Sequence, residues 1–382
     1  MDDQPYAQRI LTWTGGPPDV DRFVALGGVR LPAEPDPAAL RRALDAVVAR
    51  HPVLGAGPVT LHTVDDVWAA AAAGRYPPDA KCLLWAYLAG RELLLVAHHT
   101  VSDPWSMRLL LREILLPVTG APATHRGGTT TPTHEQVRRA VPFWRGMLAD
   151  VPSLTPGFHD GDSDGDSDGG GDGGGGGDGG DPTAEIRMPS GITQQEASAV
   201  ARAVRSTPFV VLLTAFARAL SPLSGSEAVI PVLTHGRRRS EWDTVGLYMN
   251  VLPVRLRTPT VRAVHHAFAE AYAHEIPFPT LLDAVPQADA LFADGGPHLA
   301  QFEVIQVPEG DGIDPLTIPP GLGLGGPILP VNGLAFWLEP ASGGAYTACL
   351  RYRRSHRDAD MQALIQRFIH SWEDARADAH RA

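Results

Sequence analysis

The chain has 382 residues, of which 44% are apolar, and a formal charge of −11 to which eight aspartates between Asp160 and Asp181 contribute most. This composition suits one large or two medium globular cores and gives no clustered basic surface for nucleic acid. The two cysteines, Cys82 and Cys349, are far apart, which favours reduced thiols over a disulfide framework. No apolar run reaches the ~18 residues of a membrane span and the polar start is unlike a signal peptide, so we expect a cytoplasmic protein without a membrane partner.

The first part of the chain predicts a helix, a hairpin and a second helix. Asp36 is a good cap and Pro37 a good first residue for an amphipathic helix. Apolar runs at 82–88 and 92–98, separated by three turn residues, predict a hairpin or two adjacent strands. HHTVSDPWS (98–106) then lies between the second strand and a segment with helical spacing. Asp103 suits a helix cap there and Pro104 the first turn, where its missing N–H costs the helix nothing.

Residues 160–181 read DGDSDGDSDGGGDGGGGGDGGD and contain no apolar side chain. Such a segment cannot form a core and predicts a flexible linker. It begins like an EF-hand loop, but Gly171 stands where that loop needs a bidentate Glu, so we predict no calcium site. The predicted regions are an N-terminal lobe at 1–158, a disordered linker at 159–182 and a C-terminal lobe at 183–382.

The second part of the chain again mixes helices and strands. Residues 207–225 predict a buried helix, and 358–378 repeat apolar residues with helical period. Strands are predicted within 228–239, 245–257 and 297–307. Neither half alternates strand and helix regularly, which favours two α+β lobes over a doubly wound sheet.

Several motifs, in order, carry a family resemblance. YAQRILTW (6–13), RHPVL (50–54) and HHTVSDPWS are similar to the "AQ.R", "RH..LR" and HHxxxDG motifs of non-ribosomal peptide synthetase condensation domains. HGRRR (235–239), VGLYMNVLPVRL (245–256) and HEIPF (274–278) follow in family order. The chain therefore resembles a condensation domain of the chloramphenicol acetyltransferase-like superfamily, in a trimmed, free-standing form.

The resemblance implies a fold, partners and site roles. The fold would be a V-shaped pseudo-dimer of two chloramphenicol acetyltransferase-like lobes, with a tunnel passing His99. An acyl or peptidyl carrier protein acting in trans would deliver the acyl group on its phosphopantetheine arm, with no cofactor bound by the chain itself. A small amine or alcohol, free or carrier-bound, would be the acceptor. His99 would act on the attacking nucleophile, and Asp103 would pair with Arg237.

The residues themselves agree with this chemistry. An imidazole can accept a proton near neutral pH, and a buried Asp103 would need a cationic partner. Without a GxSxG elbow, direct transfer is favoured over a covalent acyl-enzyme. His98 fits a buried histidine that holds the loop. A zinc site formed by the two histidines and Asp103 would need a further ligand, so no metal is predicted.

Four more residues are candidates to line the tunnel. Pro104 and Trp105 follow the aspartate, while Tyr248 and Asn250 lie in the predicted strand of VGLYMN, where strand packing explains them equally well. Pro104 stands where the family has glycine, so one backbone N–H that could hold the thioester oxygen is missing. The arginine of "RH..LR" is also absent, because Gly55 follows Leu54.

Two hypotheses remain open. The first is a stand-alone condensation enzyme that forms an amide, or secondarily an ester, in natural-product biosynthesis such as that of antibiotics. The second is a catalytically silent condensation-like module that docks carrier proteins or tailoring enzymes. An epimerisation domain is disfavoured by the Trp105–Ser106 order, and heterocyclisation by the lack of its aspartate pair.

Overall fold

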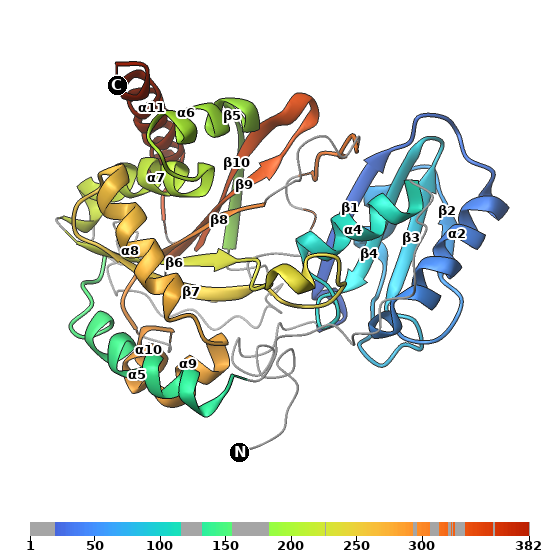
Figure 1. The fold of residues 1–382 in the computed structure, drawn as a ribbon. Helices are drawn as coiled ribbons and strands as arrows, with labels where there is room; N and C mark the ends of the chain where they lie inside the picture. The colour runs from blue at the N-terminus through green and yellow to red at the C-terminus, as the bar shows by residue number, and fades with distance from the viewer. Residues whose placement is uncertain are drawn as a thin grey trace, which may run out of the picture.

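The computed structural model describes residues 20–115, 132–154, 183–225, 227–292, 296–305, 313–319, 322, 324, 333–353 and 356–381. They form two lobes, each built on one β-sheet with helices packed against it (Figure 1). The predicted α+β class with two lobes is confirmed. The motif at 6–13 and the predicted linker at 159–182 lie outside the described residues.

The first lobe contains a four-stranded sheet in the order β1-β4-β3-β2. All its pairs are antiparallel except β2 with β3. The strands are β1 (Val24–Arg30), β2 (Thr60–Thr63), β3 (Leu84–Ala89) and β4 (Glu92–His98). The helices are α2 (Pro37–Arg50), α3 (Val67–Ala73) and α4 (Pro104–Leu115), with short 3-10 turns η1 (Val20–Arg22) and η2 (Pro52–Leu54).

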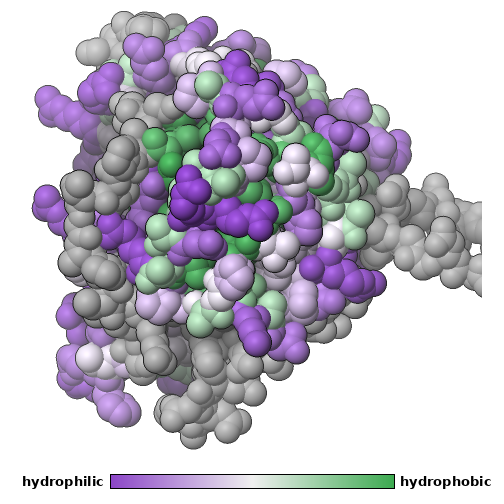
Figure 2. Space-filling model, turned by 90° about the vertical axis from the view of Figure 1, so that its right-hand side faces the viewer, coloured by the Kyte–Doolittle hydropathy of each residue, from purple (hydrophilic) through white to green (hydrophobic). Residues whose placement is uncertain are grey.

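Local sequence explains most of this lobe. The predicted hairpin forms between β3 and β4, with Gly90 at φ 55° in the turn. Asp36 caps α2 as predicted, because its carboxylate accepts hydrogen bonds from the N–H groups of Ala38 and Ala39. The outer face of this lobe mixes hydrophilic side chains with scattered apolar ones (Figure 2).

The second lobe contains a six-stranded mixed sheet in the order β5-β10-β9-β8-β6-β7. The strands are β5 (Thr183–Thr193), β6 (Ala228–Thr234), β7 (Asn250–Leu256), β8 (Leu299–Val304), β9 (Gly333–Pro340) and β10 (Ala345–Arg353). The helices are α5 (His134–Met147), α6 (Gln194–Ala203), α7 (Pro208–Ser224), α8 (Val261–Ala273), α9 (Phe278–Ala284), α10 (Pro286–Phe292) and α11 (Asp358–Arg381). Two 3-10 turns, η3 (Arg239–Glu241) and η4 (Ser342–Gly344), connect strands.

Helix α7 forms the centre of the second core. It is buried over nearly its whole length, as its apolar sequence predicts. Its Phe216 stacks on Phe302 of β8 at 5.0 Å and lies 4.9 Å from Phe336 of β9, measured between ring centroids. Helix α11 packs beside it through the periodic apolar face predicted for the last segment.

Helix α5 is placed differently from the predicted lobe boundary at residue 158. Its Trp144 and Ala140 belong to the core of the second lobe, and the Trp144 indole donates a hydrogen bond to the His274 carbonyl at 2.8 Å. Leu154 also packs there. Part of the predicted N-terminal lobe therefore belongs in space to the C-terminal one.

Two segments of the second half reach the first lobe. The N–H of Leu316 donates to the Gly28 carbonyl at 3.1 Å, and the N–H of Arg30 donates to the Asp314 carbonyl at 2.9 Å. Val245 is buried in the core of the first lobe. The two lobes are thus joined by backbone and core contacts as well as by the chain itself.

Within the described ranges, no single helix is long and apolar enough to cross a membrane. The helices α6 and α7 pass that test only as a pair, with a bend of 93° between them.

Candidate active site

The two histidines of HHTVSDPWS occupy the end of β4 and the loop after it. His98 is fully buried, and its Nδ1 lies 2.7 Å from the Thr100 hydroxyl. Its ring also meets Phe23 edge-on at 6.2 Å. These contacts agree with the predicted loop-holding role.

His99 faces a cavity between the lobes. The His99 ring stacks on the Phe23 ring, with 4.8 Å between centroids. The backbone N–H of His99 donates to the backbone carbonyl of Phe23 at 2.9 Å. Burial lowers the pKa of His99 below its ordinary 6.5, so the ring is neutral at neutral pH. Nδ1 is buried without a hydrogen-bond partner among the described residues, and His99 lines the smaller of two cavities described below. A neutral imidazole in this position can accept a proton.

Asp103 and Arg237 form the predicted ion pair. The guanidinium donates two hydrogen bonds to the carboxylate, at 2.7 and 2.9 Å, and both side chains are almost completely buried. The geometry is bidentate, which is the strongest form of this contact. Because Asp103 lies in the first lobe and Arg237 in the second, the pair connects the two lobes.

Further hydrogen bonds complete this buried pair. The Asp103 carboxylate also accepts from the N–H of Ser106 at 2.8 Å, as a helix cap of α4, and from the N–H of Tyr248 at 3.0 Å. The Arg237 guanidinium donates to the Ser106 hydroxyl at 2.7 Å and lies over the Tyr248 ring at 4.5 Å. Asp103 is therefore both a cap and an inter-lobe contact, as its sequence context predicts.

Tyr248 and Asn250, predicted as possible tunnel-lining residues, do not line either of the two cavities described below. Tyr248 precedes β7, where its N–H and ring contact the ion pair. Asn250 begins β7, and its side-chain amide is bound to Glu275, to the Ile276 carbonyl and to the Phe278 N–H. Polar side chains in a strand sequence look alike whether they face a cavity or hold neighbouring elements.

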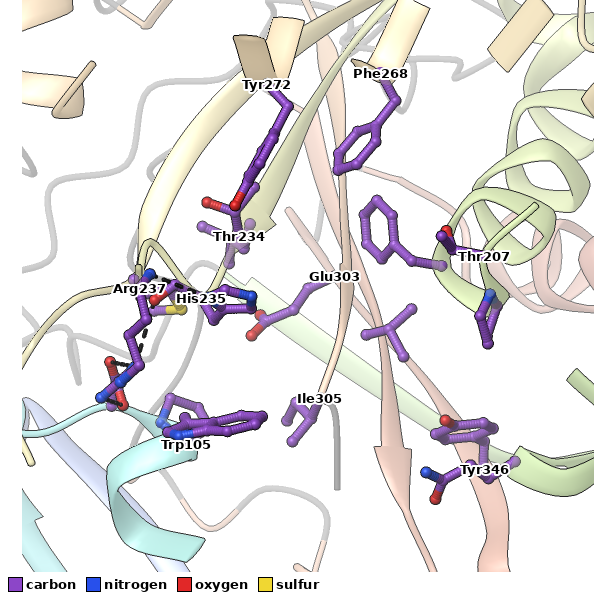
Figure 3. Close-up of a pocket in the computed structure, with 18 of the residues that line it drawn as sticks. Trp105, Thr207, Thr234, His235, Arg237, Phe268, Tyr272, Glu303, Ile305 and Tyr346 are labelled. Carbon is purple, nitrogen blue, oxygen red and sulfur yellow. Dashed lines mark hydrogen bonds and ion pairs between the residues drawn. The ribbon is translucent and has the colours of Figure 1, made fainter. Parts of the chain in front are cut away.

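Two cavities, of about 380 and 180 Å³, lie between the lobes. The larger is lined by Trp105 and Asp103 from the first lobe and by aromatic and polar side chains from the second (Figure 3). The smaller is lined by His99 and β1 on one side and by β9 on the other. Five residues line both cavities: Pro104, Leu233, Met249, Glu303 and Ile305. The cavities therefore meet at Pro104, and both predicted residues Pro104 and Trp105 line them.

Three further ionisable residues at or near the cavities were not predicted from the sequence. His235 lines the larger cavity, and its Nδ1 accepts a hydrogen bond from the Arg237 N–H at 3.0 Å. Burial and the nearby Arg237 lower the pKa of His235. Glu275 is held by Thr234 and Asn250, and burial raises its pKa. Glu303 lines both cavities, and a charged residue in a mostly apolar strand sequence is the signal that could have found it.

The described residues contain no group of three His, Cys, Asp or Glu side chains that could hold a metal ion. Neither cysteine of the described part of the chain is disulfide-bonded.

Comparison with known proteins identifies the fold. The structure of SgcC5 from Streptomyces globisporus, in complex with a naphthyl ethanediol and sucrose, superposes with a TM-score of 0.70 at 20% identity, covering 98% of this chain and 99% of that one. The condensation domain of the Monacolin K polyketide synthase MokA superposes with a TM-score of 0.68 at 16% identity over 97% and 95% of the two chains. The chain has the condensation-domain fold. The expected chloramphenicol acetyltransferase-like, two-lobed α+β class is thereby confirmed.

Proteins with this fold have different roles. The X-domain from teicoplanin biosynthesis, solved in complex with OxyB, superposes on this chain with a TM-score of 0.61 at 16% identity, over 99% of this chain and 94% of that one. No family model matches the sequence. A probable non-canonical non-ribosomal peptide synthetase, CymA of Salinispora arenicola, is 29% identical in an alignment of 288 positions that covers 66% of this chain and only 4% of that protein. The likeness extends to non-ribosomal peptide and polyketide systems, and the activity has to be argued from the site.

Proposed function

We propose that this protein is a condensation enzyme that transfers an acyl group from a carrier-protein thioester to a small amine, forming an amide. The observation that carries the proposal is His99, a neutral histidine facing a cavity that runs between the two lobes. The carrier protein would act in trans and present the thioester on its phosphopantetheine arm. No cofactor of the chain's own is required for this reaction.

The proposed reaction uses the imidazole of His99 as the proton acceptor. The amine nitrogen attacks the thioester carbonyl carbon, and Nε2 of His99 accepts the proton that the nitrogen must lose. The C–S bond then breaks, and the same proton passes to the departing sulfur. The Asp103–Arg237 pair does not take part in proton transfer; it holds the loop that carries His99 against the second lobe.

Pro104 affects the expected rate. It is the first residue of α4 and lines both cavities, but it has no N–H to donate to the oxyanion. Loss of one oxyanion donor costs about 2.7–4 kcal/mol in other enzymes. We therefore expect a slower acyl transfer than a glycine at this position would give.

The larger cavity favours an acceptor with an apolar body. Its walls include Trp105, Phe209 and Phe268, and they bury the apolar surface of a small ligand. The similar SgcC5 was solved with a naphthyl-substituted diol. An aromatic amine is thus our preferred acceptor, and the corresponding alcohol, which would give an ester, is the second choice.

A silent docking module is the alternative function. Pro104 favours it, because it removes a donor from the site, and the X-domain of teicoplanin biosynthesis was solved bound to another protein, OxyB. The retained His99 and Asp103 favour catalysis.

The first prediction tests the enzyme. His99→Ala is expected to abolish product formation from an acyl-loaded carrier protein and an amine, because no other neutral imidazole of the described residues lines the smaller cavity. Product is measured by mass spectrometry, and circular dichroism checks that the variant keeps the wild-type fold. Full activity of a folded His99→Ala protein would exclude the proposed role. Wild-type protein that only binds carriers, without any turnover, would support the docking module.

A further inference from the structure

Glu303 projects into the space between the lobes. It lies on β8 directly after Phe302, which packs into the second core against Phe216. Because side chains alternate along a strand, Glu303 points to the opposite face, toward the first lobe. It is one of the five residues that line both cavities, and Figure 3 shows its side chain extending into the larger cavity beside His235. Glu303 is therefore placed at the junction between the aromatic cavity and the cavity of His99.

The Glu303 carboxyl group has no hydrogen bond or ion pair within the described part of the chain. The nearby acidic residues Asp103 and Glu339, in contrast, have such partners. Asp103 is paired with Arg237, and Glu339 of the adjacent strand β9 is paired with Arg187 and accepts a hydrogen bond from the Trp337 indole at 2.8 Å. A carboxylate removed from bulk water is unfavourable without a partner. A ligand can supply that partner.

The charges around Glu303 leave a place for a cation. Burial, together with the negative charges of Glu339 and Asp103, raises the pKa of Glu303 to about 8. The arginines Arg187, Arg237 and Arg351 are each bound to another carboxylate, and Arg108, which also lines the smaller cavity, donates to the Ile313 carbonyl at 3.5 Å. His235 is kept neutral by burial and by Arg237, since both lower its pKa. A positively charged ligand group would therefore find a carboxyl group that has no cationic partner among the described residues.

The walls of the larger cavity suit the rest of such a ligand. Trp105, Phe209, Phe268, Tyr272 and Tyr346 line it. Aromatic faces attract cations and bury apolar groups at the same time. The combination of these walls with one unpartnered carboxyl group matches an amine with an aryl or alkyl body.

We propose that Glu303 binds the ammonium group of an aryl or alkyl amine acceptor and removes one of its protons. This inference rests on the proposed function. At pH 7 the empty site holds a protonated Glu303, so binding of the ammonium ion first releases that proton to solvent; the ammonium ion then gives one proton to the carboxylate, which leaves a neutral amine and a carboxylic acid. The amine nitrogen then forms the C–N bond, the C–S bond breaks, and His99 carries the second proton from nitrogen to sulfur. After the amide leaves, Glu303 keeps its proton until the next ammonium ion binds.

Calorimetric binding tests the ammonium site without any carrier protein. The probes are 2-phenylethylamine and hexylamine, each with its neutral twin, 2-phenylethanol and 1-hexanol. Wild-type protein should bind at least one amine about tenfold more tightly than its alcohol, and Glu303→Gln should bind both alike. The control Glu135→Gln removes an exposed carboxylate on α5 and should behave as wild type. Equal amine binding by wild type and Glu303→Gln, no preference for amine over alcohol, or no binding of any probe would each overturn the proposal.

Turnover separates proton removal from a merely structural role. In Glu303→Gln, kcat/KM for the amine should fall about tenfold or more at pH 7 and recover as the pH approaches the pKa of the free amine. The value for the twin alcohol should stay unchanged, because an alcohol brings no ammonium proton. An equal loss for amine and alcohol would refute the role of Glu303 in proton removal. Amine binding that depends on Glu303, without product from any loaded carrier, would leave the ammonium site standing and refute the proposed function instead.

Discussion

Asp103 combines a local and a long-range role in one carboxylate. It caps α4 through the N–H of Ser106, and it holds Arg237 and the N–H of Tyr248 from the second lobe. Four hydrogen bonds compensate the charge that burial would otherwise make unfavourable. Glu303 is the opposite case, because its carboxyl group has no such compensation among the described residues. The contrast separates a residue that holds the site from one that is open to a ligand.

The stability of the protein should report on Glu303. In the unfolded chain its carboxyl group ionises near pH 4.5, whereas in the folded protein its pKa is about 8. The folded state keeps the proton longer, so this group makes stability fall as the pH rises from about 4.5 to 8. Glu303→Gln should therefore melt higher than wild type, by a margin on the order of 2 °C at pH 8 and near zero at pH 4.5. Calorimetry at several pH values measures this, and a margin independent of pH would contradict it.

At the scale of elements, α5 shows that position along the chain does not decide which core a helix joins. Thr133 caps it with a capping box, so the helix begins for local reasons. The helix then packs on the second lobe, where it contacts α9, and its Trp144 indole donates a hydrogen bond at the end of α8. The helix is a part of the first half of the sequence that stabilises the second lobe.

Trp144 carries much of this contact and predicts a large effect. Its side chain is fully buried and its indole is hydrogen-bonded, so Trp144→Ala should lower the free energy of unfolding by about 3–5 kcal/mol. Urea unfolding followed by circular dichroism measures the loss. The control Trp242→Ala removes an indole that is 47% exposed and should change stability by less than about 1 kcal/mol. Similar values for both variants would contradict the placement of α5 in the core.

In the complete fold, backbone, core and ion-pair contacts join the two lobes close to the candidate active site. The segment around Leu316 extends the edge of β1, Val245 enters the first core, and Asp103 binds Arg237 across the boundary. These contacts surround the cavities and fix the distance between His99 and the second lobe. The geometry of the site therefore depends on the relative position of the two lobes.

The ion pair predicts coupling between the lobes. Asp103→Ala should lower the free energy of unfolding by about 3–5 kcal/mol, because it leaves Arg237 buried without a counter-charge. The acyl-transfer rate should fall with it, since the loop of His99 loses its anchor. Arg237→Ala should cost a similar amount, and the double variant less than the sum of the two. A normal melting temperature for Asp103→Ala would count against a stabilising role of the pair.

Sequence reasoning succeeds where neighbours along the chain decide the structure. The hairpin of β3 and β4, the capped starts of α2 and α4 and the burial of α7 are all set by residues within a few positions of one another. It does not distinguish roles for Tyr248 and Asn250, because an identical strand pattern fits a cavity wall and the hydrogen-bonded packing sites that these residues occupy. The pairing of Asp103 with Arg237, which are 134 residues apart, was predicted through the resemblance and is present in the structure.

Residues read along the chain predict the local elements and the two mixed lobes through capping and periodicity, and the histidine, aspartate and arginine of the site through the order of the family motifs. The packing of α5 in the second core, the position of Glu303 on both cavities and its lack of a hydrogen-bond or ion-pair partner among the described residues cannot be predicted from neighbours in sequence. Those properties depend on which distant segments approach one another in space. A carboxyl group is a bound structural group or an open binding group according to the partners that folding brings to it.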